Sequence, residues 1–208
     1  MNGNPPSDPS VDFYNRDAVA YVRDTLNVEM SALYEPFLSL VRPAGHILDA
    51  GCGSGRDCRA FLASGYAVTA IDASPELARL ASELVGQPVI VTRFQSLAFE
   101  GMFDGVWACA SLLHVARSEI DDVLSRLTRA LKPGGALFMS FKVGEEERTE
   151  RGRLFNYYTE ATLDALLARH SELNVVRTWR TRDRRPHREA EEWLNALALK
   201  NSSCELPT

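Results

Sequence analysis

Apolar residues recur at helical spacing along the first part of the chain. Over residues 13–41 they return about every three to four positions, which predicts two helices broken near Asn27. Pro43 and Gly45 would end the second helix. Residues 1–11 are rich in Pro, Gly, Asn and Ser, so we expect a flexible N-terminal arm there.

From residue 46 onward, short apolar runs alternate with helical patterns. The predicted elements are strand 46–50, helix 56–64, strand 66–72, helix 74–86, strand 88–94, strand 103–110, helix 118–131, strand 136–142, helix 159–170 and strand 173–180. This alternation indicates one doubly wound α/β domain over residues 12–200, with parallel strands and no second domain. Residues 201–208 would form a C-terminal tail.

The last patterned segment, residues 189–200, is ambiguous. Its composition favours a helix, but its residues alternate at the period of two that is typical of a strand: Trp193, Asn195, Leu197 and Leu199 on one side, and Leu194, Ala196 and Ala198 on the other. The sequence leaves both alternatives open.

Composition narrows the classes of protein that the chain can belong to. It has 208 residues, 45% apolar and 25% charged, with a net charge of −5. This balance makes nucleic acid and anionic membranes unfavourable as main partners. No long apolar stretch or signal sequence is present, which predicts a cytoplasmic protein. The four cysteines (Cys52, Cys58, Cys109 and Cys204) show neither disulfide nor zinc spacing, so we expect reduced thiols and no metal site.

The segment LDAGCGSGRD (48–57) places three glycines directly after the first predicted strand. Glycines at such a position form a tight turn, or allow backbone to approach a ligand at the carboxyl edge of the sheet. A dinucleotide fingerprint, GxGxxG, would need a small residue where Arg56 stands, and no GK[ST] of a Walker motif follows. Both of these phosphate-binding motifs therefore fail.

The spacing DAGCGSG (49–55) resembles motif I of class I S-adenosylmethionine-dependent methyltransferases. Four further segments resemble the family's motifs in the correct order: AIDAS (70–74), RFQSLAF (93–99), FDGVWACASLLHV (103–115) and LKPGG (131–135). The resemblance covers about residues 12–200 and is strongest to small methyltransferases of the tellurite-resistance type. It implies a Rossmann-like seven-stranded sheet of order 3-2-1-4-5-7-6, with strand 7 antiparallel and residues 12–43 as a helical lid.

The same resemblance implies S-adenosylmethionine as the cofactor, with S-adenosylhomocysteine as the product. Asp72 would bind the ribose hydroxyls, because a carboxylate accepts charge-assisted hydrogen bonds from a diol. Ser74 would cap the next helix and so free Asp72 for that role. The full set of implied cofactor-binding residues is Tyr14, Tyr21, Asp49, Ala50, Gly51, Gly53, Gly55, Arg56, Asp72, Ala73, Gln95, Ser96, Leu97, Ala110 and Ser111.

Candidate residues on the acceptor side follow the fourth and fifth predicted strands. His114 would lie beside the reacting methyl group, where it could accept a proton near neutral pH or only shape the pocket. A polar loop over residues 143–159 carries four candidate substrate-binding residues: Arg153, Phe155, Tyr157 and Tyr158. Residues 177–188 contain six arginines, which are expected to be solvated charges on a hairpin connection.

These features together predict methyl transfer to a small-molecule acceptor by in-line displacement. Methylation of RNA or protein is an alternative that only the arginine-rich stretch supports. A non-catalytic, cofactor-binding regulator and a dehydrogenase are further alternatives. The sequence identifies neither the acceptor atom nor the oligomeric state.

Overall fold

Seven strands form one mixed sheet in the computed structural model, which describes residues 8–185 and 188–202. Along the sheet the strands are β3 (Ile90–Val91), β2 (Ala67–Asp72), β1 (His46–Ala50), β4 (Phe103–Ala108), β5 (Leu131–Lys142), β9 (Glu192–Lys200) and β8 (Leu173–Arg182). Neighbours from β3 to β5 pair in parallel, whereas β9 is antiparallel to both β5 and β8. Numbered within this sheet, the order is 3-2-1-4-5-7-6, so the predicted Rossmann-like fold is confirmed.

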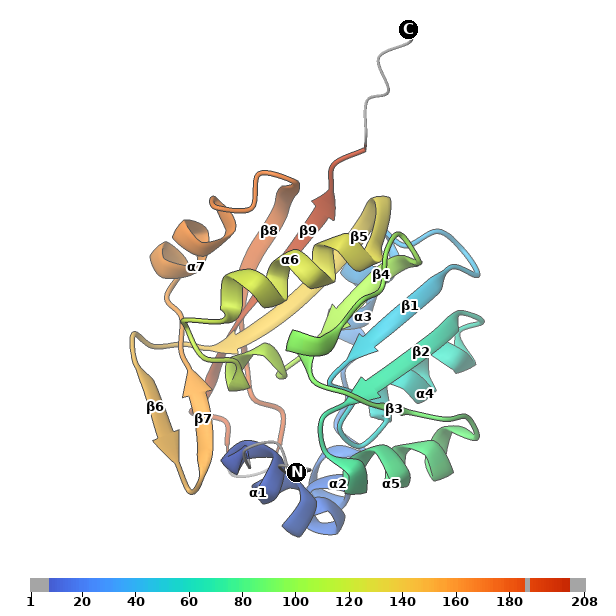
Figure 1. The fold of residues 1–208 in the computed structure, drawn as a ribbon, viewed down its shortest axis with the longest axis vertical. Helices are drawn as coiled ribbons and strands as arrows, with labels where there is room; N and C mark the ends of the chain where they lie inside the picture. The colour runs from blue at the N-terminus through green and yellow to red at the C-terminus, as the bar shows by residue number, and fades with distance from the viewer. Residues whose placement is uncertain (1–7, 186–187, 203–208) are drawn as a thin grey trace, which may run out of the picture.

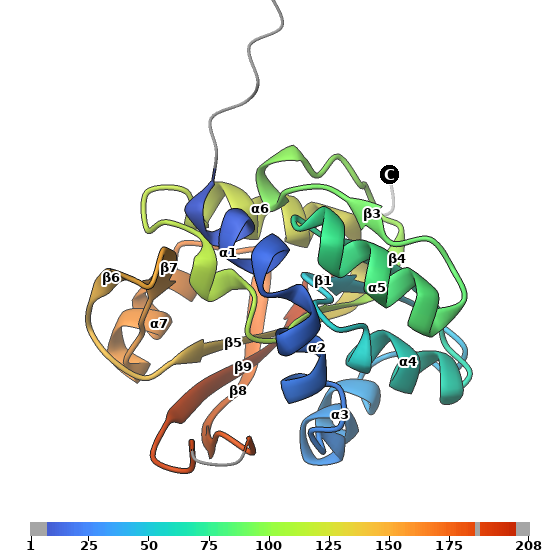
Figure 2. The ribbon, with the colours of Figure 1, turned by 90° about the horizontal axis from the view of Figure 1, so that it is seen from below.

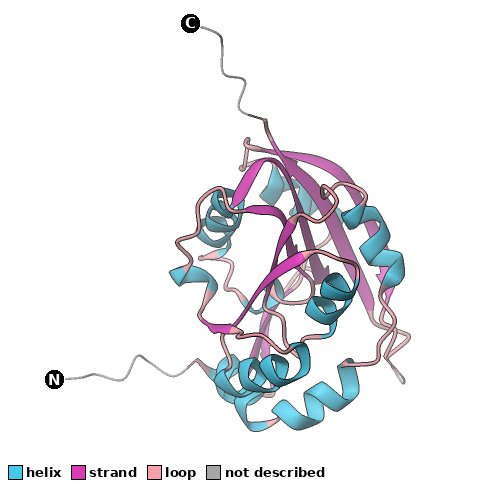
Figure 3. Cartoon of the chain, turned by 90° about the vertical axis from the view of Figure 1, so that its right-hand side faces the viewer, coloured by secondary structure: helices cyan, strands magenta, loops and turns pink. Residues whose placement is uncertain are grey.

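Helices cover both faces of the sheet (Figure 3). One face packs on α3 (Ser31–Leu38), α4 (Arg56–Ala63) and α5 (Pro75–Val85), and the other on α6 (Ile120–Ala130) and α7 (Glu160–Leu167). The central strand β4 contributes to both cores, because Val106 and Trp107 point to opposite faces and both are fully buried. Burial on both sides explains why the strands are continuously apolar.

The N-terminal helices lie across the carboxyl ends of the parallel strands (Figures 1 and 2). They are α1 (Pro9–Arg16) and α2 (Ala18–Thr25), so the chain breaks at Asp17 as well as near Asn27. Helix α1 begins inside the segment predicted to be an arm, because the Asp8 side chain caps it by accepting from Ser10 N at 2.9 Å and Pro9 takes its first position. The prediction of a loose arm is therefore wrong for residues 8–11, and residues 1–7 lie outside the described residues.

Three further expectations need correction or a decision. Residues 143–159 contain a hairpin, β6 (Glu147–Glu150) and β7 (Arg153–Asn156), in place of the expected loop. The predicted strand 88–94 is shorter in the structure: only Ile90–Val91 pairs with β2, at the edge of the sheet. Segment 189–200 forms β9, since its residues are buried on both faces between β5 and β8, and this burial overrides a helix-rich composition.

Candidate cofactor and acceptor site

The loop between β1 and α4 depends on glycine at three positions. Gly51, Gly53 and Gly55 have φ angles of 81°, 53° and 76°, and residues with a side chain rarely adopt such angles. A Cβ on Gly51 would lie 2.5 Å from Ser111 Cβ, and one on Gly53 would lie 3.0 Å from the ring of Tyr21. A Cβ on Gly55 would instead lie 3.1 Å from Ala81 Cβ of α5. The loop is therefore held against the segment after β4 and against the lid.

Asp72, the last residue of β2, joins that strand to the glycine loop. Its Oδ2 accepts from Gly53 N at 2.9 Å and its Oδ1 accepts from Ser74 N at 2.8 Å. The Ser74 hydroxyl does cap α5 by accepting from Leu77 N, but Asp72 is not free, contrary to expectation. A carboxylate offers about four acceptor positions, so Asp72 keeps capacity for a ligand. Burial raises its pKa, and the backbone hydrogen bonds oppose that shift.

A first cleft opens beside Asp72, beneath the lid helices. Nine of the residues predicted to bind the cofactor line it: Tyr14, Tyr21, Gly51, Gly53, Asp72, Ala73, Gln95, Ala110 and Ser111. Asp8, Ser10, Val11 and Phe94 also line it, although none of them was singled out in the sequence. Two features of the sequence point to this part of the cleft: Asp8 before Pro9, which is typical of a helix start, and the segment RFQSLAF (93–99), which contains Phe94.

Six predicted residues do not line the first cleft: Asp49, Ala50, Gly55, Arg56, Ser96 and Leu97. Leu97 is buried in the core, and the Ala50 carbonyl accepts from Ser111 Oγ at 2.7 Å. Arg56 lies toward the neighbouring cleft and forms an ion pair with Asp57 at 2.6 Å. Asp49 is buried, and its Oδ2 has no hydrogen-bond partner in the described structure.

A second, larger cleft of about 1190 Å³ lies beside the first. Arg153 and Phe155 line it, as predicted for an acceptor site, but Tyr157 and Tyr158 do not. The Tyr157 hydroxyl accepts from Arg148 at 3.0 Å, outside the cleft. Tyr158 is buried, and its hydroxyl accepts from Asn156 Nδ2 at 3.1 Å.

The two clefts share five lining residues: Tyr14, Tyr21, Gly51, Ala110 and His114. We call this group the junction. Ala110 holds a left-handed φ of 52° there, and its N–H donates to Ser140 Oγ at 2.8 Å. Such a conformation costs about 1–3 kcal/mol and is concentrated at functional sites. The junction therefore connects the two clefts through a strained backbone.

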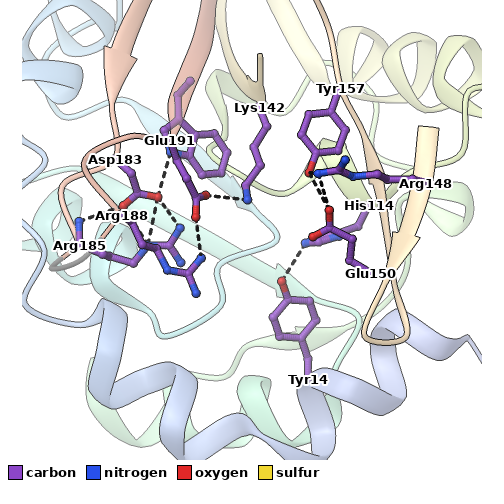
Figure 4. Close-up of polar contacts among 11 residues, drawn as sticks. Tyr14, His114, Lys142, Arg148, Glu150, Tyr157, Asp183, Arg185, Arg188 and Glu191 are labelled. Carbon is purple, nitrogen blue, oxygen red and sulfur yellow. Dashed lines mark hydrogen bonds and ion pairs between the residues drawn. The ribbon is translucent and has the colours of Figure 1, made fainter. Parts of the chain in front are cut away.

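His114 forms a hydrogen bond through each ring nitrogen, and Figure 4 shows the one to Tyr14 of the lid. Its Nδ1 lies 2.6 Å from the Leu154 carbonyl, which can only accept, so Nδ1 carries the proton. Nε2 therefore accepts from the Tyr14 hydroxyl, at 2.8 Å. Burial lowers the pKa of His114 to about 4, and the charge of Arg153 lowers it further against the opposing hydrogen bond to Leu154. The expectation that His114 titrates near neutral pH is wrong, because the ring is fully desolvated.

Comparison with known proteins places this site within a family. Residues 48–139, from the end of β1 into β5, match the model of a methyltransferase domain. The structure also resembles the 1,6-didemethyltoxoflavin-N1-methyltransferase of Burkholderia thailandensis, solved with its acceptor and S-adenosylhomocysteine, at a TM-score of 0.72, 26% identity and coverage of 96% of this chain and 93% of that one. Residues 48–139 therefore resemble a methyltransferase domain. This match and the shared fold support the predicted family, S-adenosylmethionine-dependent methyltransferases of class I.

Two curated relatives resemble this methyltransferase domain in sequence. The ubiquinone biosynthesis O-methyltransferase of Xanthomonas campestris pv. campestris (strain B100) is 38% identical over 105 residues, or 47% of this chain and 43% of the relative. The cypemycin N-terminal methyltransferase of a Streptomyces species is 33% identical over 141 residues, or 64% of this chain and 57% of the relative. The chain thus spans about half the length of these curated relatives.

Three further observations concern membrane-spanning helices, metal-ligating groups and cysteines. Within residues 8–185 and 188–202, no helix is long and apolar enough to cross a membrane. The same residues contain no group of three His, Cys, Asp or Glu side chains placed to hold a metal ion. Cys52, Cys58 and Cys109 have free thiols, and Cys204 lies outside the described residues.

Proposed function

We propose that the protein is an enzyme that transfers the methyl group of S-adenosylmethionine to a small-molecule acceptor. The observation that carries this proposal is the junction, where a cleft suited to the cofactor meets a cleft large enough for an acceptor. Clefts of this size commonly bind small molecules. The resemblance to a small-molecule methyltransferase that binds S-adenosylhomocysteine supports the same cofactor here.

The residues of the first cleft fit S-adenosylmethionine. Asp72 has acceptor positions for the ribose hydroxyls, and Phe94 and Gln95 offer a surface for the adenine. Gly51 leaves space that a Cβ would fill. The orphaned Oδ2 of Asp49 is a buried acceptor behind the glycine loop, and such atoms in native proteins call for a partner.

When bound, S-adenosylmethionine supplies an activated methyl group with a neutral leaving group, so alignment provides much of the rate. Tyr14 and Tyr21 exclude water at the junction from the lid side. Burial raises the pKa of Tyr14, so its hydroxyl stays protonated and donates to His114. With a pKa of about 4, His114 is too weak a base for efficient proton abstraction at neutral pH. We therefore assign His114 a positioning role: it orients Tyr14 toward the junction.

The charges of residues 177–188 weigh against the alternative of RNA methylation. Arg180 forms ion pairs with Glu160 at 2.5 Å and Glu192 at 3.0 Å, and Arg185 pairs with Asp183 at 2.5 Å. With Arg188, which lies 3.5 Å from Glu191, three of the six arginines of this stretch are compensated by carboxylates, whereas phosphate binding needs available cations. The likeness to the cypemycin enzyme keeps a peptide acceptor as the second candidate. The tellurite-resistance-type subfamily stays a prediction.

Calorimetry with S-adenosylmethionine, S-adenosylhomocysteine and NADH tests the cofactor first. We expect the first two to bind in the micromolar range and NADH not to bind; NADH binding alone would overturn the proposal. Transfer of radiolabelled methyl groups is then measured into small-molecule, peptide and RNA fractions. We expect incorporation into the small-molecule fraction. Incorporation only into peptide or RNA would show that the acceptor belongs to that class instead. Binding of the cofactor without any transfer would indicate a regulator.

A further inference from the structure

The second cleft is strongly cationic, although the chain as a whole is acidic. Nine Lys and Arg side chains and five Asp and Glu side chains line the cleft, an excess of four positive charges. The whole chain has a net charge of −5. A cleft that concentrates positive charge raises the local concentration of anions. The charge of this cleft therefore points to an anionic ligand.

Five of the nine cations that line this cleft form ion pairs with carboxylates of the described chain. Lys142 pairs with Glu191 at 2.6 Å, Arg188 approaches the same carboxylate at 3.5 Å, and Arg185 pairs with Asp183 (Figure 4). These groups hold the end of the β8–β9 hairpin together, so they are not the best candidates for binding a ligand.

Arg153 differs from them. It forms no ion pair with any carboxylate of residues 8–185 and 188–202, and its Nε is buried without a hydrogen-bond partner. Its guanidinium carbon lies 4.1 Å from the ring centre of Phe13 and 4.9 Å from that of Phe155. The two rings fix the guanidinium plane. The Nε–H is a buried donor without an acceptor, which carries a free-energy cost.

We propose that Arg153 binds an anionic group of the methyl acceptor, a carboxylate or a phosphate. This inference rests on the proposed function and names the class of its substrate. The planar fork of a guanidinium binds either anion through two parallel hydrogen bonds. The ring of Tyr14, a junction residue, lies 5.9 Å from the Arg153 guanidinium carbon. The methylated atom would therefore lie close to the anionic group, which describes a compact acid.

Stacking alone is the structural alternative for Arg153, because the side chain also joins β7 to α1. Replacement by Met keeps an apolar side chain of similar length between Phe13 and Phe155 but removes the donors and the charge. Replacement by Lys keeps the charge and loses the fork. Arg148→Met is the matched control: it removes a positive charge from the same hairpin, at a residue that does not line the cleft.

The test is calorimetry on protein saturated with S-adenosylhomocysteine, with benzoate, inorganic phosphate and the neutral benzamide as probes. We expect at least one anion to bind, benzamide to bind much more weakly than benzoate, and Arg153→Met to weaken the anion about tenfold or more. Arg153→Lys should fall between, and Arg148→Met should match the wild type. In NMR spectra the Arg153 Nε–H resonance, assigned by its loss in Arg153→Lys, should shift when the anion is added.

Each outcome decides a separate point. Binding of benzoate alone identifies a carboxylate, and binding of phosphate alone identifies a phosphate. Absence of binding by both anions up to about 10 mM, or equal binding by Arg153→Met, overturns the assignment of Arg153. Failure of S-adenosylhomocysteine to bind overturns the proposed function instead. Thermal unfolding of each variant shows whether the fold is kept.

Discussion

Replacement of Asp72 by Asn tests the assignment of the ribose site most directly. The amide keeps the size of the carboxyl group but has one oxygen, whereas Asp72 accepts through both oxygens, from Gly53 N and Ser74 N. One of these N–H groups would face the NH₂ group of Asn, and the charge that strengthens hydrogen bonds from the ribose would be lost. Hydrogen bonds to charged groups contribute about 1.5–3 kcal/mol.

That loss corresponds to a rise in the dissociation constant of S-adenosylhomocysteine of about 10- to 100-fold, measured by calorimetry at neutral pH. Because the pKa of Asp72 is raised, wild-type affinity should fall as the pH is lowered toward that value, while the Asn variant should show a flatter profile. Asp164→Asn, an exposed change on α7, is the control. An affinity of Asp72→Asn within about threefold of the wild type, with the fold intact, would refute the ribose assignment.

Two other predictions concern the scaffold. Burial opposes ionisation of Asp104, but hydrogen bonds from Arg42, the backbone of His46 and Lys132 lower its pKa. Chemical denaturation should show Asp104→Asn about 1–2 kcal/mol less stable at pH 7. This difference should shrink as the pH falls below about 4, because Asp104 of the unfolded wild type then takes up a proton while folded Asp104 stays ionised. Gly51→Ala should abolish S-adenosylhomocysteine binding, because its Cβ would meet Ser111 at 2.5 Å. Gly86 has a similar φ of 71° but open space around it, so Gly86→Ala should lower the free energy of unfolding by only about 1 kcal/mol and bind S-adenosylhomocysteine normally. Equal binding by both glycine variants, or a pH-independent Asp104 effect, would contradict these arguments.

The sequence predicts the first cleft well because local signals encode it. Strand β2 ends at Asp72, and the glycine loop follows β1, so parallel pairing alone brings both to one edge of the sheet. Leu97 fails as a contact because η1 (Phe94–Ser96) turns the chain before it, and Leu97 then enters the core. Whether a motif residue faces a ligand or the core depends on such turns, which the apolar pattern does not reveal.

The second cleft could be predicted only in part, because its walls come from distant parts of the chain. Residues 143–159 contain four candidate residues, but without the hairpin their directions cannot be assigned. In β7, Arg153 and Phe155 share one face because strand side chains alternate. Tyr157 follows the end of the strand, so this alternation no longer fixes it. The positive charge of Arg153 was visible in the sequence, but its lack of a carboxylate partner is a property of the folded chain.

The junction also shows why single substitutions differ in what they reveal. Tyr14 donates to His114, His114 donates to the Leu154 carbonyl of β7, and the N–H of Leu154 donates to Ser10 Oγ of α1 at 3.0 Å. The lid, the positioning residue His114 and the strand that carries Arg153 thus form one connected group, within which the effects of substitutions are not additive. A change at Tyr14 therefore alters both clefts and the attachment of the lid. Asp72 lines only the first cleft, so its substitution reports on cofactor binding without disturbing the acceptor side.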